Sequence, residues 1–125
     1  RCSVNVNHRF PPGKDRDSIL ADVRALAGDE AELELVDYCP AGRICVDNPH
    51  VQGLMAAWQQ VHGTPLEGAA KQAWTDVGRL SERGIDAVNF GPGATHQCHQ
   101  RQEWVSVASI QRCQAAMEQW LWGGA

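Results

Sequence analysis

The amino-acid sequence predicts an α/β fold that is built from two different parts. Apolar and polar residues alternate over residues 2–10 and again over 31–38, which predicts two half-buried strands. A helical apolar pattern lies between them, so residues 1–38 are expected to form a β-α-β piece, half of a ferredoxin-like sandwich. After residue 46, helix and strand patterns alternate, which is typical of an α/β layer.

The elements of the first part are bounded by turn and capping residues. The strand over residues 2–10 is followed by the turn sequence PPGKD. Asp15 or Asp17 can cap the next helix, and Gly28 ends it. The second strand is followed by the loop CPAGRICVDNPH, so we expect a boundary between structural parts near residues 40–47.

The second part should begin with a helix that is capped by Asp47 or Asn48 and has Pro49 in its first turn. A weakly patterned strand is predicted over residues 67–72, followed by a short helix capped by Thr75. The apolar run IDAVNF predicts a buried strand that ends at the sequence GPG. The last helix is predicted over VSVASIQRCQAAMEQWLW, whose apolar residues fall near one face.

Length, composition and charge exclude several classes of protein. The 125 residues suit one domain, and 43% hydrophobic and 21% charged residues are values of a globular chain. The net charge is −4 and no basic stripe interleaves with aromatic residues, which argues against a nucleic-acid partner. No apolar run approaches the roughly 20 residues that a membrane span needs, so no membrane association is expected.

The cysteines favour a reducing compartment. Their number is odd and no C-x-x-C motif occurs, so we expect free thiols and a cytoplasmic protein. Cys98 lies beside His96 and His99, which leaves a thiol nucleophile as a minor alternative, because sequence neighbours seldom form a working pair. The chain starts at Arg1 within a predicted strand, and we therefore expect it to be a piece of a longer protein.

The stretch GPGATHQCHQRQEWV, residues 91–105, is the strongest candidate for a functional site. It follows a predicted buried strand, and ligands of open α/β sheets gather beyond the carboxyl ends of strands. Imidazole is a common zinc ligand, but catalytic zinc needs about three protein ligands, more than His96 and His99 supply. The stretch is thus part of a site at most, and His8, His50 and His62 are interpreted as ordinary surface residues.

The sequence AWTDVGRLSERGIDAVNFGPG, together with HQRQEWV, resembles the carboxyl-terminal segment of a di-zinc amidohydrolase and metallopeptidase family. That family includes succinyl-diaminopimelate desuccinylase, acetylornithine deacetylase and glutamate carboxypeptidase. Thr75, Asp76 and Arg79 match its TD…R helix start, and His99 and Glu103 match its H-x-x-x-E-x-V ending. The amino-terminal VNVNHRFPP also resembles a V-x-x-N-x-R-F strand of the family, so the likeness covers most of the chain.

The resemblance implies two domains and a larger enzyme. Residues 1–45 would be the second half of a lid or dimerisation domain, through which a homodimer forms. Residues 46–125 would be the carboxyl-terminal part of an α/β zinc-peptidase-like catalytic domain. The other zinc ligands and the general base of the family lie upstream, so no catalytic residue is expected in this chain.

The resemblance also implies roles for particular residues. His99 would bind metal, with Glu103 as its outer hydrogen-bonding partner. Asn7, Arg9 and Thr75 would contact substrate, since a guanidinium meets a carboxylate bidentately. Complete family enzymes hold two zinc ions, for which cobalt or manganese could substitute.

The function that this implies is hydrolysis of an amide. Zinc-activated water would attack the N-acyl bond of a small N-acyl amino acid or peptide-like substrate. The isolated chain is expected to be inactive. The alternative is a non-catalytic α/β dimerisation or regulatory module whose metal site is lost. For Arg9 the alternative is a structural ion pair with a nearby acid such as Asp37.

Overall fold

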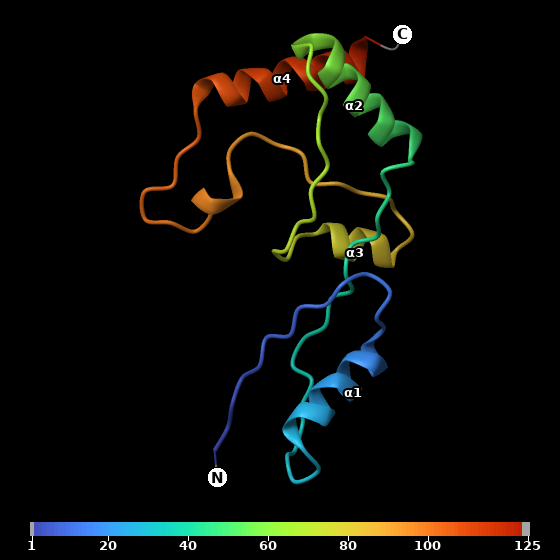
Figure 1. Cartoon of the computed structure of the whole chain (residues 1–125), viewed down its shortest axis with the longest axis vertical. Helices are drawn as coiled ribbons and strands as arrows, with labels where there is room; N and C mark the ends of the chain where they lie inside the picture. The colour runs from blue at the N-terminus through green and yellow to red at the C-terminus, as the bar shows by residue number, and fades with distance from the viewer. Residues whose placement is uncertain (1, 124–125) are drawn as a thin grey trace. The chain divides into compact units, whose positions relative to one another are not determined.

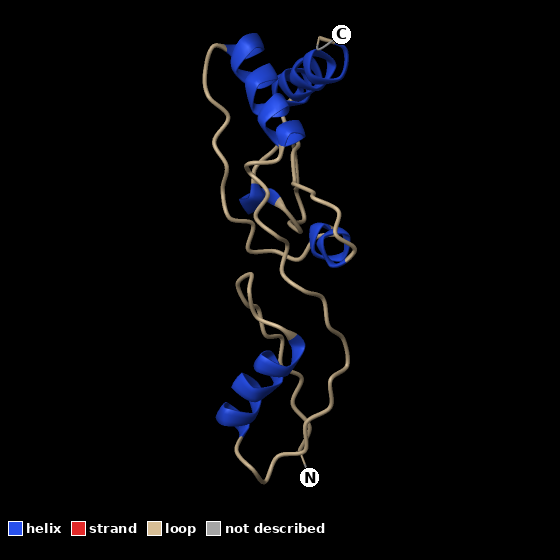
Figure 2. Cartoon of the chain, turned by 90° about the vertical axis from the view of Figure 1, so that its right-hand side faces the viewer, coloured by secondary structure: helices blue, strands red, loops and turns tan. Residues whose placement is uncertain are grey.

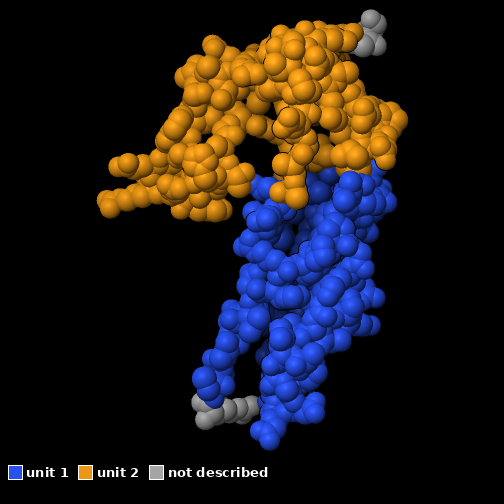
Figure 3. Space-filling model, in the orientation of Figure 1, with its two compact units in different colours: residues 1–44, 71–87 blue, residues 45–70, 88–125 orange. Residues whose placement is uncertain are grey.

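The computed structural model describes residues 2–123, which fall into two compact units coloured separately in Figure 3. Unit 1 consists of the chain up to Ile44 together with Lys71–Ala87. Unit 2 consists of Cys45–Ala70 together with the chain from Val88 onwards. The predicted division into residues 1–45 and 46–125 concerns domains of a larger protein and stays a prediction.

The helices lie where the sequence patterns predict them (Figure 1). In chain order they are α1 (Arg16–Ala27), α2 (Pro49–His62), α3 (Val77–Glu82), the 3-10 helix η1 (Thr95–Gln97) and α4 (Val107–Trp122). The predictions of a helix before Gly28, a helix starting at Pro49, a short helix and a final helix are therefore confirmed.

Helix α1 in unit 1 is set by its caps. The Oδ1 atom of Asp15 accepts a hydrogen bond from the backbone N–H of Ser18 at 2.9 Å, so Asp15 is the N-cap. The helix ends at Gly28, whose φ of 79° suits a residue without a side chain. Ile19 is the buried residue of this helix, and Leu26 is exposed.

Helix α3, also in unit 1, packs tightly on the chain near Pro40. A Cβ atom on Gly78 would lie 2.3 Å from the Pro40 carbonyl oxygen, so glycine is what allows this approach. The prediction of Thr75 as the cap was wrong, because Asp76 holds the N-cap position, where its side chain makes no capping hydrogen bond. The Thr75 carbonyl accepts a hydrogen bond from the Gly78 N–H at 3.3 Å.

Unit 2 is built around the contact between helices α2 and α4. Asn48 caps α2, with Pro49 in the first turn, and Ser106 caps α4. The contact buries Leu54 and Ala57 of α2 and Ala116 of α4. Gly53 lies against the Trp120 indole, where a Cβ would be 3.3 Å from Nε1. Small residues thus let the two helices approach closely.

The predicted α/β fold class is wrong for this chain. No strand occurs among residues 2–123, and Figure 2 shows the connections between helices as loops. The ranges predicted as strands, 2–10, 31–38, 67–72 and 85–90, are all without regular structure. The β-α-β half of a ferredoxin-like domain and the α/β zinc-peptidase-like sheet are therefore both absent from the described residues.

The predicted strands do not form because the alternation of apolar and polar residues determines only which side of a segment is apolar. A strand also needs a neighbour to share its backbone hydrogen bonds and to cover its apolar face. In unit 1, Val4 and Val6 remain 79% and 62% exposed and Leu35 remains 37% exposed, so the expected apolar faces are not buried within this unit. In unit 2, α2 and α4 pack on each other, and no sheet of described residues lies between them.

No helix within the described part of the chain has both the length and the apolar character needed to cross a membrane.

Candidate functional site

The loop that joins residues 85–90 to α4 carries both histidines of the predicted site. It starts at Gly91–Pro92–Gly93, passes through the single turn of η1 and ends at the α4 cap Ser106. Gly93 has a φ of 98° and makes the turn possible, because other residues rarely adopt this conformation. Both imidazoles, those of His96 and His99, are exposed.

His99 and Glu103 are held together in one tight turn. His99 has a φ of 63°, the only positive value for a non-glycine residue in the described chain. Its backbone N–H donates to the Oε2 atom of Glu103 at 3.0 Å. The Glu103 N–H donates to the Gln100 carbonyl at 3.2 Å. The predicted pair is adjacent, and its contact is made through the backbone of His99.

A hollow of about 250 Å³ lies along the same loop within unit 2, and neither His99 nor Glu103 lines it. Trp104 and Val105 give it apolar walls, while Ser106, Ser109 and His96 supply polar groups. Cys98 does not line the hollow, and its sulfur makes no hydrogen bond to either imidazole within residues 2–123. The geometry therefore gives the thiol-nucleophile alternative no support.

The predicted substrate-binding residues belong to unit 1. The Nη1 atom of Arg9 donates to the Gln72 carbonyl at 2.9 Å. Asp37 pairs with Arg79 at 3.4 Å, so the alternative Arg9–Asp37 pair does not form. Asn7 is exposed, and Thr75 is half-buried before α3. The role of these residues in binding substrate stays a prediction.

Sequence reasoning missed an aromatic cluster in unit 2. The Trp58 ring lies 4.4 Å from the His62 ring and 6.0 Å from the Phe90 ring, measured between centroids. The guanidinium carbon of Arg112 lies 5.0 Å above the Trp58 ring, a cation–π contact. The i, i+4 spacing of Trp58 and His62 on one helix was the available signal, and His62 is therefore more than an ordinary surface residue.

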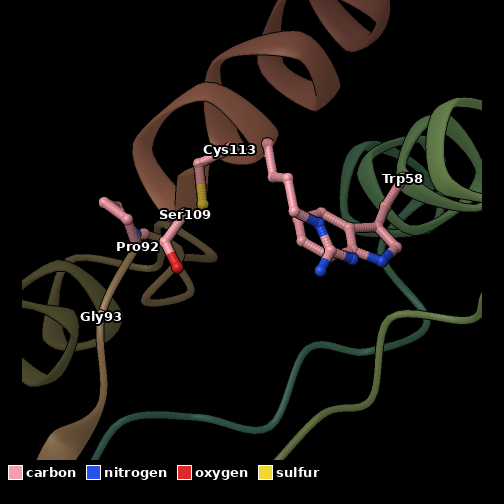
Figure 4. A pocket seen from close by; sticks show the side chains of 7 residues that line it. Trp58, Pro92, Gly93, Ser109 and Cys113 are labelled. Carbon is pink, nitrogen blue, oxygen red and sulfur yellow. The ribbon is translucent and has the colours of Figure 1, made fainter. Parts of the chain in front are cut away.

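Beside this cluster is a second hollow, of about 140 Å³. Figure 4 shows Trp58 on one side of it, and Ser109, Cys113, Pro92 and Gly93 on the other. Burial raises the pKa of the Cys113 thiol, and the neighbouring Arg112 charge opposes this only in part. The thiol therefore stays protonated at neutral pH and is a poor nucleophile.

A comparison of the sequence with known families decides the relationship of the chain. The profile of peptidase family M20/M25/M40 matches residues 3–122. The chain belongs to this family. Its membership agrees with the resemblance seen in the motifs around Thr75, His99 and Glu103.

Several curated relatives in the family are similar over nearly the whole chain. A putative succinyl-diaminopimelate desuccinylase of Mycobacterium tuberculosis is 32% identical over 124 residues, which is 98% of this chain and 33% of that protein. A succinyl-diaminopimelate desuccinylase of Corynebacterium glutamicum is 30% identical over 124 residues, which is 94% of this chain and 32% of that protein. The chain thus spans about a third of the length of these relatives. No solved structure matches it.

The residues present do not form a metal site by themselves. Nowhere in residues 2–123 do three or more His, Cys, Asp or Glu side chains cluster closely enough to hold an ion. His99 is a single exposed imidazole, and a zinc site needs about three or four protein ligands. The role of His99 as a metal ligand stays a prediction.

Proposed function

We propose that the chain is the carboxyl-terminal portion of a metal-dependent amide hydrolase of the desuccinylase, deacylase or aminoacyl carboxypeptidase type. The observation that carries this proposal is the similarity to desuccinylases over 124 residues, in which the chain corresponds to a third of each relative. Support comes from the turn in which the Glu103 carboxylate accepts a hydrogen bond from the His99 backbone N–H.

In this proposal the substrate is a small N-acyl amino acid or a peptide-like amide. The names of the relatives favour a succinylated amino compound. Arg9 would bind a substrate carboxylate, with Asn7 and Thr75 near it, and His99 would supply one ligand to a zinc ion. Cobalt or manganese could replace zinc, and the complete protein would be a homodimer through residues 1–45.

The lack of disulfides among the cysteines supports the cytoplasm as the compartment of the complete protein. All five are without disulfides, and Cys45 is buried as a small apolar side chain.

The decisive test replaces each of the two loop histidines in the complete polypeptide. His99→Ala should lose one metal equivalent per chain, measured by elemental analysis, and most of the amide hydrolysis. His96→Ala is the matched control, since His96 lies on the same loop and is also exposed. It should keep the metal, and circular dichroism should show that both variants remain folded.

Two outcomes would contradict the proposal. Full metal content in His99→Ala would remove His99 from the metal site. A complete polypeptide without metal-dependent amide hydrolysis would favour the alternative, a dimerisation or regulatory module with a lost metal site. The 125-residue chain alone should bind zinc weakly and be inactive, because one ligand does not replace several.

A further inference from the structure

The smaller hollow in unit 2 has the features of a binding site for an anion. It measures about 140 Å³, whereas roughly 10–15 Å³ suffices for one water molecule. Of the described residues that line it, Arg112 alone is charged, and the others are Trp58, Gly91, Pro92, Gly93, Ser109 and Cys113. The space therefore fits a small organic molecule next to one positive charge.

The Arg112 guanidinium is placed to bind such a molecule. It lies over the Trp58 ring, with the guanidinium carbon 5.0 Å from the ring centroid. A guanidinium that stacks on a ring keeps the N–H donors along its edge available for hydrogen bonds. Within residues 2–123 the ion pairs of arginines involve Arg43 and Arg79, and none involves Arg112.

The Trp58 indole, over which Arg112 lies, is held in place by neighbouring side chains in the absence of a ligand. The rings of His62 and Phe90 both contact Trp58, and the Nε2 atom of His62 lies 3.0 Å from the Arg112 carbonyl oxygen. These contacts tie α2 to α4 at the hollow. Because the groups are already in position, less conformational entropy is lost on binding.

We infer that this hollow binds a small carboxylate. The planar fork of Arg112 would donate two parallel hydrogen bonds to the carboxylate oxygens, and the Ser109 hydroxyl would donate a third. The indole of Trp58 would cover a short alkyl chain. A single guanidinium balances one negative charge, which suits a carboxylate better than a phosphate dianion. The site uses neither His99 nor a metal, so it does not depend on the proposed function.

Propionate is the probe, and its neutral amide, propionamide, is the matched control of nearly equal size. Titration of the ¹⁵N-labelled 125-residue chain should show saturable shifts of the Arg112 Nε–H and Trp58 indole N–H signals with propionate. The amide should cause much smaller shifts, because it lacks the charge that the guanidinium recognises. Equal responses to both compounds would overturn the inference.

A pair of arginine variants separates a built site from general charge attraction. Arg112→Gln should weaken propionate binding about tenfold or more, since it removes the charge-assisted hydrogen bonds. Arg101→Gln removes the same charge within unit 2, at a residue that does not line the hollow, and should leave binding unchanged. Equal losses in the two variants would contradict the assignment.

A third variant keeps the test valid if Arg112→Gln disturbs the fold. Ser109→Ala removes a hydroxyl and the hydrogen bond that it accepts from the Ser106 hydroxyl, while the Ser109 backbone N–H can still donate to Ser106. It should weaken binding by a few-fold while the spectrum of α2 and α4 is retained. Unchanged propionate binding in a folded Ser109→Ala variant would contradict the assignment of propionate to this hollow.

Discussion

The two units of this chain differ in what stabilises them. Unit 2 buries Cys45, Leu54, Ala57 and Ala116, whereas Ile19 is the buried apolar side chain described in unit 1. Both units leave several large apolar side chains exposed, but the two packed helices of unit 2 bury part of their apolar faces against each other. Unit 1, whose helices do not pack on each other, has fewer buried apolar side chains and depends more on polar contacts.

The polar contacts of unit 1 contribute less free energy than an apolar core would. Arg43 pairs with Asp86 at 2.5 Å and donates through its backbone N–H to the Ser81 hydroxyl at 3.0 Å. Exposed ion pairs contribute about 0–1 kcal/mol, whereas burying one leucine contributes about 1.5–3 kcal/mol. We therefore expect unit 2 to unfold after unit 1.

The largest loss of stability should come from replacing a buried leucine in the contact between α2 and α4. Leu54 is 5% exposed, and Leu54→Ala should lower the free energy of unfolding of unit 2 by about 2–5 kcal/mol, because it leaves a cavity. Leu26 on α1 is 86% exposed, so the same change there should cost less than about 0.5 kcal/mol. Thermal unfolding followed by circular dichroism measures both, and equal effects would break the distinction between the units.

In unit 1 the largest effect should come from the backbone contact at α3. A Cβ on Gly78 would meet the Pro40 carbonyl, so Gly78→Ala should cost about 1–3 kcal/mol although alanine is the better helix former. In unit 2, a Cβ on Gly68 would meet no atom within 4 Å, so Gly68→Ala should be nearly neutral. Urea unfolding distinguishes the two. If Gly78→Ala were as stable as the unmodified chain, the backbone near Pro40 would have to move to make room for the added methyl group.

These differences explain how much of the structure could be predicted from sequence. The ends of the helices could be predicted, because they are set by capping residues next to them in the sequence, such as Asp15, Asn48 and Gly28. The strands failed because pairing depends on segments far apart in the sequence, and alternation says nothing about whether a partner is present. The alternation at Val4 and Val6 indicates an apolar face, but it does not reveal that this face stays exposed.

In the candidate site, too, contacts between residues close in sequence could be predicted, whereas contacts between distant segments could not. The resemblance implied that Glu103 is a hydrogen-bonding partner of His99, and the structure places the two residues together, with the Glu103 carboxylate on the His99 backbone N–H rather than on its imidazole. The approach of Arg112 to Trp58 spans 54 residues of sequence, since 112 minus 58 is 54, and no local pattern indicates it. Contacts within a turn were predictable, and contacts between helices were not.

A smaller effect, on kcat/KM rather than on stability, is expected when the guanidinium of Arg9 in unit 1 is replaced. If Arg9 binds a substrate carboxylate, Arg9→Lys in the complete polypeptide should reduce kcat/KM about tenfold, because lysine cannot bind bidentately. Arg83→Lys is the matched control, since Arg83 also donates to a backbone carbonyl, that of Arg79. A lowered melting temperature with unchanged kinetics would show that Arg9 serves only the Gln72 contact.

The smallest effect should be the dependence of α1 on pH through its cap. The Ser18 backbone N–H, followed by the Ser18 hydroxyl, lowers the pKa of the Asp15 carboxyl below its ordinary value of 3.8. Because the pKa is lower in the folded state, the cap stabilises the helix above the unfolded pKa, and this contribution is lost as the pH falls through the folded pKa.

Asp15→Asn isolates this contribution, because asparagine caps helices about as well as aspartate but does not titrate there. Between about pH 6 and pH 2, the Ser18 amide signal of the unmodified chain should shift as Asp15 is protonated, and the helicity of α1 should fall. In Asp15→Asn both changes should be much smaller. An identical pH profile in the two proteins would show that the Asp15 cap is not the source of the acid sensitivity of α1. In that case the polar contacts between segments, rather than the local cap, would distinguish unit 1 from the helix pair of unit 2.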